Sequence, residues 1–188
     1  MKKILLVNAS PRKGGNSDIV TQTLAKNLTG CEVTIFNMRE KNCKPCIACG
    51  VCQKKETQIC VQNDDIKELL SLLNECDSIV LTTPIYNQQI TSQAKLFIER
   101  WYPFFNVEHK LMSNTTKYGK KGAMICCFWG SPIEVITKYA DWTLEGFSQI
   151  GVEDTKALIF PHIPEKGDIL KKEEYLQQLH ELAVWLAE

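Results

Sequence analysis

The sequence lacks any apolar run of the roughly 18 to 20 residues that a transmembrane helix requires. Met1–Lys3 is followed by only four strongly apolar residues, fewer than the core of a secretory signal peptide needs. Basic and acidic side chains balance at 22 each, so no excess of positive charge favours nucleic acid or an anionic membrane. These absences predict a cytoplasmic protein with no membrane or nucleic-acid partner.

Two glycine motifs of nucleotide-binding proteins are also missing. The chain has no G-x-G-x-x-G and no G-x-x-x-x-G-K-[ST], which argues against a dinucleotide-binding Rossmann unit and against a P-loop. Histidine is scarce, and none of the three is placed to form a helical H-x3-H pair, so no role is assigned to His109, His162 or His180. Cysteine is abundant instead: nine residues, an odd number, suggest thiol or metal chemistry in a reducing cytoplasm rather than disulfides.

A polar loop at 8–17, NASPRKGGNS, follows the unbroken apolar run 4–7, which is typical of a strand buried on both faces. An amphipathic helix comes next, with Ser17 as its predicted N-cap. Because free N–H groups and the positive end of a helix dipole meet there, the loop predicts an anion site, best suited to the monophosphate of a mononucleotide. A purely structural βα loop is the alternative. The candidate phosphate ligands are Ser10, Arg12, Asn16 and Ser17.

Strand and helix patterns alternate along the whole chain. Predicted strands occupy 4–7, 32–37, 78–83, 122–128 and 154–160, and the intervening helices include one capped by Asp64-Asp65. Such alternation implies right-handed crossovers and a parallel sheet with helices on both faces. We therefore predict an α/β fold of the flavodoxin-like, doubly wound kind: a five-stranded parallel sheet in the order 2-1-3-4-5 within three α/β/α layers. It would form a single domain over 1–188 with a cysteine-rich insertion at about 38–63.

In this fold a ligand lies beyond the carboxyl ends of the central strands. The loops at that edge would begin at Ala9, Pro84 and Trp129. We expect a ligand site between these three loops.

Several motifs resemble the NAD(P)H-dependent FMN reductase-like family of flavodoxin-fold proteins over about residues 3–130. They are Asn8-Ala9-Ser10-Pro11-Arg12-x3-Asn16-Ser17, Pro84-Ile85-Tyr86 and Lys95-Leu96-Phe97-Ile98-Glu99-Arg100. A narrower resemblance is to the iron–sulfur flavoprotein branch of that family. It rests on Cys46-Ile47-Ala48-Cys49-Gly50-Val51-Cys52, Cys60 and Asp64-Asp65.

The resemblance implies FMN as cofactor and NAD(P)H as electron donor. Ser10, Arg12, Asn16 and Ser17 would then hold the FMN phosphate. The isoalloxazine ring would lie beside Pro84, Ile85, Tyr86, Asn87 and Gln88, and topology adds Trp129 and Gly130 on the third side. Hydride transfer to a flavin requires no acid–base side chain, so no catalytic residue is assigned. For Tyr86, an ordinary core aromatic at a strand end is the alternative.

The cysteine segment has the spacing Cys43-x2-Cys46-x2-Cys49-x2-Cys52-x7-Cys60. Thiolates at such spacing can converge on one centre, as in [4Fe–4S] and zinc sites. The resemblance implies a [4Fe–4S] cluster on Cys46, Cys49, Cys52 and Cys60, while zinc or unligated thiols remain alternatives. The remaining cysteines, Cys31, Cys76, Cys126 and Cys127, are predicted to be small core residues.

The leading functional interpretation is an FMN-dependent oxidoreductase that passes electrons, through a cluster or directly, to a flavin, quinone, nitro or azo compound. A non-enzymatic electron carrier between redox proteins and a zinc-stabilised binding module are the alternatives. We also expect a homodimer or higher homo-oligomer. The aromatic run Trp101, Tyr102, Phe104 and Phe105 is assigned either to an interface bordering the flavin or to the core.

Overall fold

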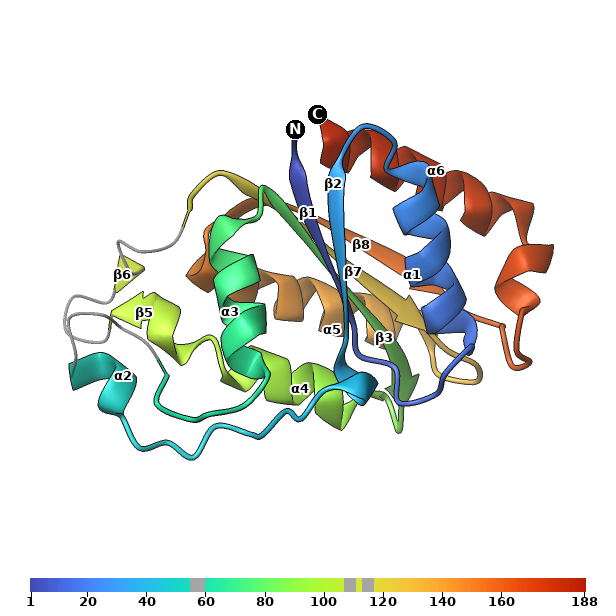
Figure 1. The fold of residues 1–188 in the computed structure, drawn as a ribbon. Coiled ribbons are helices and arrows are strands. Elements are labelled where there is room, and N and C mark those ends of the chain that lie inside the picture. Colours follow the sequence, from blue (N-terminus) through green and yellow to red (C-terminus); the bar gives the residue numbers. More distant parts are fainter. Residues whose placement is uncertain (55–59, 107–110, 113–116) are drawn as a thin grey trace.

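Helices cover both faces of a central sheet in the computed structural model of the chain, which describes residues 1–54, 60–106, 111–112 and 117–188 (Figure 1). The main strands are parallel and follow the order β2-β1-β3-β7-β8. Their bounds are Lys3–Asn8 (β1), Glu32–Asn37 (β2), Ser78–Tyr86 (β3), Lys120–Cys127 (β7) and Val152–Phe160 (β8). Numbered among themselves these strands have the order 2-1-3-4-5, so the predicted flavodoxin-like fold is confirmed.

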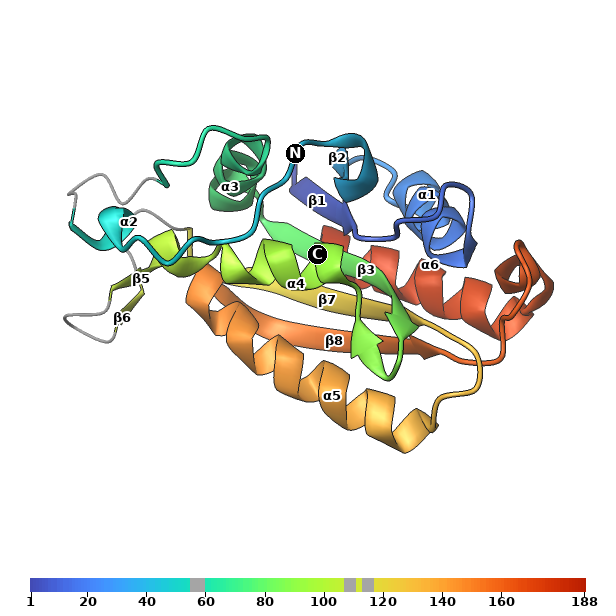
Figure 2. The same cartoon turned by 90° about the horizontal axis from the view of Figure 1, so that it is seen from below.

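The helices divide into two layers (Figure 2). Residues of α1 and α6 contribute to one buried cluster, and residues of α3, α4 and α5 contribute to the other. The helix bounds are Asn16–Asn27 (α1), Val51–Lys54 (α2), Ile66–Glu75 (α3), Ser92–Glu99 (α4), Ile133–Glu145 (α5) and Glu173–Ala187 (α6). Short 3-10 helices add Met38–Glu40 (η1), Tyr102–Phe104 (η2), Gly146–Ile150 (η3) and Asp168–Lys171 (η4). Among the described residues, no helix has the length and apolar character to cross a membrane.

The position of β1 explains its unbroken apolar sequence. Leu5 and Val7 pack into the cluster beneath α3–α5, while Ile4 and Leu6 pack into the cluster beneath α1 and α6. Alternate side chains of a strand point to opposite faces, so a strand covered on both sides needs apolar residues at every position.

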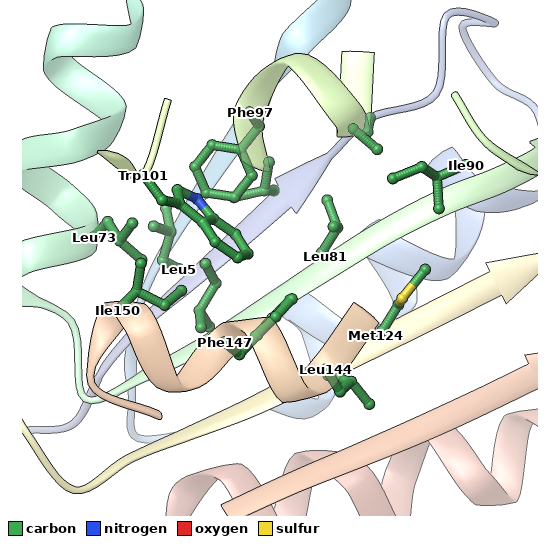
Figure 3. Packing of buried hydrophobic residues seen from close by; sticks show 14 of the residues in the cluster. Leu5, Leu73, Leu81, Ile90, Phe97, Trp101, Met124, Leu144, Phe147 and Ile150 are labelled. Carbon is green, nitrogen blue, oxygen red and sulfur yellow. The ribbon is translucent and has the colours of Figure 1, made fainter. Parts of the chain in front are cut away.

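Trp101 occupies the centre of the core beneath α3–α5 (Figure 3). Its ring meets Phe97 and Phe147 edge-on, at centroid distances of 5.3 Å and 5.0 Å. Trp101 is 2% exposed and Phe104 5%, so these two aromatics belong to the core, whereas Tyr102 is 38% exposed and does not. The side chain of Phe105 and all of His109 lie outside the described residues.

Several local features differ from the sequence expectations. The strand expected at 78–83 continues to Tyr86 and turns back into β4 (Gln89–Ile90), because β3 extends beyond its neighbour β1. α1 begins at Asn16 with Gly15 as N-cap, so Ser17 does not cap it. Asp65 is the N-cap of α3 but makes no side-chain capping bond. The sequence patterns also did not predict α2 or the short hairpin of β5 (Phe105–Asn106) and β6 (Leu111–Met112).

Candidate cofactor cleft and cysteine cavity

A cleft of about 270 Å³ opens at the carboxyl edge of the sheet. Eight of the predicted ligand residues line it: Ser10, Arg12, Asn16, Ser17, Pro84, Ile85, Tyr86 and Trp129. Five further residues, which were not predicted from the sequence, complete the walls: Gly15, Cys127, Phe128, Ile163 and Pro164. The fold thus brings the three expected loops together, and the loop after β8 adds a fourth wall.

The phosphate-loop end of the cleft is held by hydrogen bonds among its own residues. Asn8 donates from Nδ2 to Asp18 Oδ1 (2.6 Å) and accepts at Oδ1 from the Ser10 N–H (3.1 Å). Asp18 also accepts from the Gly14 N–H (2.7 Å), where a positive φ of 69° suits glycine. The N–H groups of the first turn of α1 have no partner within the helix, so an anion placed there would meet donors already oriented.

Asn16 plays a different part from the expected one. Its Nδ2 donates to the carbonyls of Ile163 (2.9 Å) and Glu165 (2.8 Å), and its Oδ1 accepts from the Gly167 N–H (2.9 Å). The amide is therefore engaged with the loop after β8 and is not directed at an anion. This loop also brings Lys166 against Gly14, where a Cβ added to the glycine would lie 2.7 Å from the Lys166 Nζ. Asn16 supports the cleft by fixing its fourth wall.

Ser17 is also less free than its sequence position suggests. It is 2% exposed, and its hydroxyl hydrogen-bonds the Cys127 thiol. Burial raises the pKa of Cys127 to about 12, and the bond from Ser17 offsets only part of that rise. Cys127 therefore stays a neutral thiol at physiological pH and is a poor nucleophile.

The second wall is the end of β3, where Pro84 pairs with Cys127 and Tyr86 pairs with Gln89 of β4. Asn87 and Gln88 form the two-residue turn between these strands, with φ of 49° and 64°. Positive φ at both positions is characteristic of a type I′ hairpin. Neither residue lines the cleft, in contrast to the sequence expectation, because the hairpin directs them to its tip.

Thr91 fastens this hairpin to the phosphate loop. Its hydroxyl donates to the Ala9 carbonyl (2.8 Å) and accepts from the Ala94 N–H (3.3 Å), capping α4. Thr91 was not among the site residues predicted from the sequence, although a Thr before a helix pattern is a recognisable N-cap.

Two large aromatic side chains flank the mouth of the cleft. Trp129 is 68% exposed and Tyr86 49% exposed, so the alternative of Tyr86 as a core aromatic is wrong. Gly130 follows Trp129 with a φ of 80° and does not line the cleft. Exposed rings at a cleft mouth are suited to stacking on a planar ligand.

The predicted cysteine set surrounds a second, much smaller cavity. Cys46, Cys49, Cys52 and Cys60 all line it, and its volume is about 20 Å³. Cys43 is separate: it packs against the core, and burial, followed by Asp64 and Asp65, raises the pKa of its thiol to about 11. Within the described residues no group of three or more His, Cys, Asp or Glu is assembled to hold a metal ion. The four thiols thus suit a metal by their chemistry and line one cavity, but in this structure their sulfur atoms do not converge on a common centre.

A buried ion pair adjoins this cavity. Arg100 Nη1 and Nη2 contact the two carboxylate oxygens of Asp64 at 2.7 Å and 3.1 Å, and the side chains are 1% and 0% exposed. Burial alone would raise the pKa of Asp64, but hydrogen bonds from Arg100 and from the Lys44 N–H outweigh it and hold that pKa below its ordinary value. Asp64 is therefore ionised in the folded protein.

Helix α4 connects the two sites. Thr91 at its N-terminus contacts the phosphate loop, and Arg100 directly after it adjoins the cysteine cavity. Figure 2 shows α2 and the cysteine segment at one end of the molecule and the carboxyl ends of the central strands at the other. The two sites therefore lie at opposite ends of α4, a helix of eight residues and roughly 12 Å in length.

The profile of the NADPH-dependent FMN reductase family matches residues 2–130, which include the walls contributed by β1, β3 and β7. The chain belongs to this family. The resemblance inferred from the loop and strand motifs is thereby confirmed.

Several curated relatives of this FMN reductase family member are named iron–sulfur flavoproteins. One from Archaeoglobus fulgidus is 34% identical over 130 residues, covering 68% of this chain and 55% of the relative. Another from Methanocaldococcus jannaschii is 30% identical over 103 residues, covering 54% of this chain and 52% of the relative. The chain thus spans about half the length of these relatives.

A solved NAD(P)H:quinone oxidoreductase from Methanothermobacter marburgensis has the same fold. It superimposes with a TM-score of 0.77 at 13% identity and covers 97% of each chain. At this identity the likeness concerns the fold, including the part after residue 130 that the family profile does not match.

Proposed function

We propose that this chain is an FMN-dependent oxidoreductase that takes electrons from NADH or NADPH and passes them to a small acceptor. The observation that carries the proposal is the cleft at the carboxyl edge of the sheet. A charged, hydroxyl-bearing loop and a helix N-terminus meet at one end of it, and a strand end and two aromatic rings line the rest.

The phosphate of FMN would lie at the loop. The donors there would be the Arg12 guanidinium and the first-turn N–H groups of α1, with Ser17 supplying its backbone N–H. The Ser10 hydroxyl, which donates to the Arg12 carbonyl (3.2 Å), would join them by turning toward the phosphate. Asn8, Asn16 and Asp18 hold these donors in place through the bonds described above.

The ring of FMN would lie along Pro84–Tyr86, with Trp129 over the mouth. The chemistry that bound FMN supplies is acceptance of hydride from a nicotinamide and onward transfer of electrons. The protein's contribution is binding, orientation and partial exclusion of water, and no side chain is assigned a proton-transfer role. Exposed aromatic rings at the mouth favour a planar acceptor such as a flavin, quinone, nitro or azo compound.

We further propose that Cys46, Cys49, Cys52 and Cys60 hold a [4Fe–4S] cluster. Their common cavity and the names of the curated relatives support it. Since the cavity holds no more than about one water molecule, the segment must open to admit a cluster, and binding would be coupled to ordering of the thiols. Zinc on the same thiols is the competing occupant.

A second candidate function is electron transfer between redox proteins. The observation that favours it is the cysteine cavity itself, because a one-electron centre in the same chain as a flavin is suited to a relay and Cys49 is exposed. Rapid reduction by NAD(P)H alone, followed by turnover with a quinone, would favour the enzyme. Slow reduction by NAD(P)H but rapid exchange with a redox protein would favour the carrier.

A homodimer is proposed on different residues from the aromatic run at 101–105. A groove of about 470 Å³ lies between α4 and α5, and Trp142 beside it is 66% exposed. Ile98, Tyr139 and Trp142 line it, so a second copy related by a two-fold axis could cover this apolar surface. Free thiols at all nine cysteines support a reducing, cytoplasmic location.

The test begins with an absorption spectrum and iron, sulfide and zinc analysis of protein purified without oxygen. Flavin bands, with iron and sulfide near four each per chain, the [4Fe–4S] stoichiometry, are expected. FMN titration of two neighbouring variants then examines the site. Arg12→Ala should weaken FMN binding by about 1.5–3 kcal/mol, whereas Lys13→Ala, which does not line the cleft, should change it little. Protein that takes up no FMN, with zinc on the thiols, would refute the proposal in favour of a zinc-stabilised binding module.

A further inference from the structure

We propose that Arg100 is a positioning residue of the cysteine cavity. Together with Asp64 it would fasten both ends of the cysteine segment and present Cys60 to the same centre as the other thiols. The inference rests on the proposed function, because it concerns the cysteine set proposed to hold a cluster.

The contacts of Arg100 reach both limbs of the segment. Nη1 donates to the Lys44 carbonyl (2.7 Å), two residues before Cys46, and Nη2 donates to the Cys60 sulfur (3.3 Å). Asp64 accepts from the Lys44 N–H (2.9 Å) while it binds the guanidinium in bidentate geometry. A planar fork bound on two edges fixes position and orientation together.

The two limbs are joined independently of Arg100 as well. Asn42 exchanges hydrogen bonds with Asp65, at 2.8 Å and 3.0 Å, and Gln62 donates to the Pro45 carbonyl (2.9 Å). These bonds close the stem of the loop. The contribution specific to Arg100 is therefore the placement of Cys60 and the charge beside it.

Burial makes a merely structural purpose a poor explanation. A buried ion pair is seldom more stabilising than apolar residues of the same volume, because both charges lose their hydration. Arg100 and Asp64 are 1% and 0% exposed, and the Nε of Arg100 has no hydrogen-bond partner among the described residues. Cysteines bind metals as thiolates, so a set of four brings negative charge that a buried guanidinium beside it would offset.

The experiment uses the full chain, reconstituted without oxygen with iron and sulfide. Four proteins are compared: wild type, Arg100→Gln, Arg100→Lys and Lys95→Gln, the last removing an exposed cation from the same helix. Measurements are iron and sulfide content, retention of iron against a chelator, cluster midpoint potential, FMN affinity and urea unfolding.

Arg100→Gln should weaken iron retention by about 10- to 100-fold, the usual effect of losing a residue that supports a metal ligand. Any cluster it does hold should show a lower midpoint potential, because a hydrogen bond to a ligand sulfur is lost. Arg100→Lys keeps the charge and should restore part of both properties. Lys95→Gln should match wild type, and FMN affinity should be unchanged throughout.

The proposal would be overturned if Arg100→Gln retained iron as strongly as the wild type and its cluster had the same midpoint potential. If Arg100→Gln fails to fold, the double variant Asp64→Asn/Arg100→Gln, which removes both buried charges, is measured in place of Arg100→Gln. Wild-type retention in that double variant would show that Arg100 only balances Asp64 and would equally overturn the proposal. Wild-type protein that takes up no iron would reject this inference and the cluster together, while FMN binding and NADPH oxidation would still report on the proposed enzyme.

Discussion

The two ends of α4 carry sites of contrasting construction. The cofactor cleft, about 270 Å³, is assembled from loops that follow four strands, and its walls are tied together by the Asn8, Asn16 and Thr91 hydrogen bonds. The cysteine cavity, about 20 Å³, is lined largely by the described residues of the cysteine segment, whose two limbs are joined by hydrogen bonds and by a buried ion pair. The walls of the first site are already in place, whereas the second would hold a metal only if its thiols were drawn together.

The comparison shows how differently the two depend on the rest of the fold. Parallel strands place their carboxyl ends at one edge, so the cleft follows from the sheet itself. Nothing in the sheet requires the cysteine segment to converge, and the free energy of metal binding would supply that order.

Removing the Asp64 carboxylate should have the largest effect on stability. That effect should arise at the cysteine cavity rather than at the cofactor cleft. Asp64→Ala leaves Arg100 buried without its counter-charge, which we expect to lower the free energy of unfolding by about 3–5 kcal/mol. The matched control is the exposed pair on α4: Lys95→Ala should cost only about 0.3–0.5 kcal/mol. Urea denaturation measures both, and similar small losses would show that the buried pair is not the support described here.

Asn16→Asp should act on the cleft side. The change removes the donor to the Ile163 and Glu165 carbonyls and puts a carboxylate beside the phosphate loop. Two carbonyls without their donor correspond to about 1–3 kcal/mol, so FMN should bind roughly tenfold to a hundredfold more weakly. Fluorescence titration with FMN measures this, and iron uptake should stay near the wild-type level. An equal loss of iron would contradict the separation of the two sites.

The buried thiol of Cys76, which lies between α3 and β3, predicts a pH dependence of stability that is separate from the cysteine segment. Burial raises the pKa of Cys76 to about 11 from the ordinary value of 9.0. Below pH 9.0 both folded and unfolded chains keep this proton, so the stabilisation is complete there. Between pH 9.0 and about 11 only the unfolded chain releases the proton, and stability falls with rising pH by about 1.4 kcal/mol per unit.

Urea denaturation across that range measures the slope, with Cys76→Ala as the comparison. In the variant, the free energy of unfolding should fall with rising pH less steeply than in the wild type, by about 1.4 kcal/mol per pH unit. An unchanged slope would mean that the pKa of Cys76 is the same in the folded and the unfolded chain.

Thr91→Val should have the smallest effect of the four and should again fall on the cleft. It removes the cap of α4 and the bond to the Ala9 carbonyl while nearly preserving volume. We expect a loss of about 1 kcal/mol in stability and about fivefold in FMN affinity. Thermal unfolding and FMN titration measure the two effects. A larger loss of iron than of FMN would show that α4 transmits the change from one site to the other.

Much of the fold could be predicted from periodicity. The apolar runs 4–7 and 78–83 and the alternation with helices were sufficient for the strand order, because right-handed crossovers leave few topologies. The eight cleft residues were found because loops after parallel strands share one edge. The role of Asn16 could not be predicted, since its partners lie about 150 positions further along the chain.

The chain's own sequence determined the alternation of strands and helices, the loop that offers donors to an anion and the spacing of the four cysteines. These are local patterns whose physical consequences do not depend on distant residues. Only the tertiary structure decided that Asn16 holds a distant loop, that Trp101 belongs to the core and that Arg100 stands beside Cys60. Each of these depends on side chains from remote segments meeting in space, where burial and hydrogen-bond satisfaction, rather than sequence spacing, select the partner.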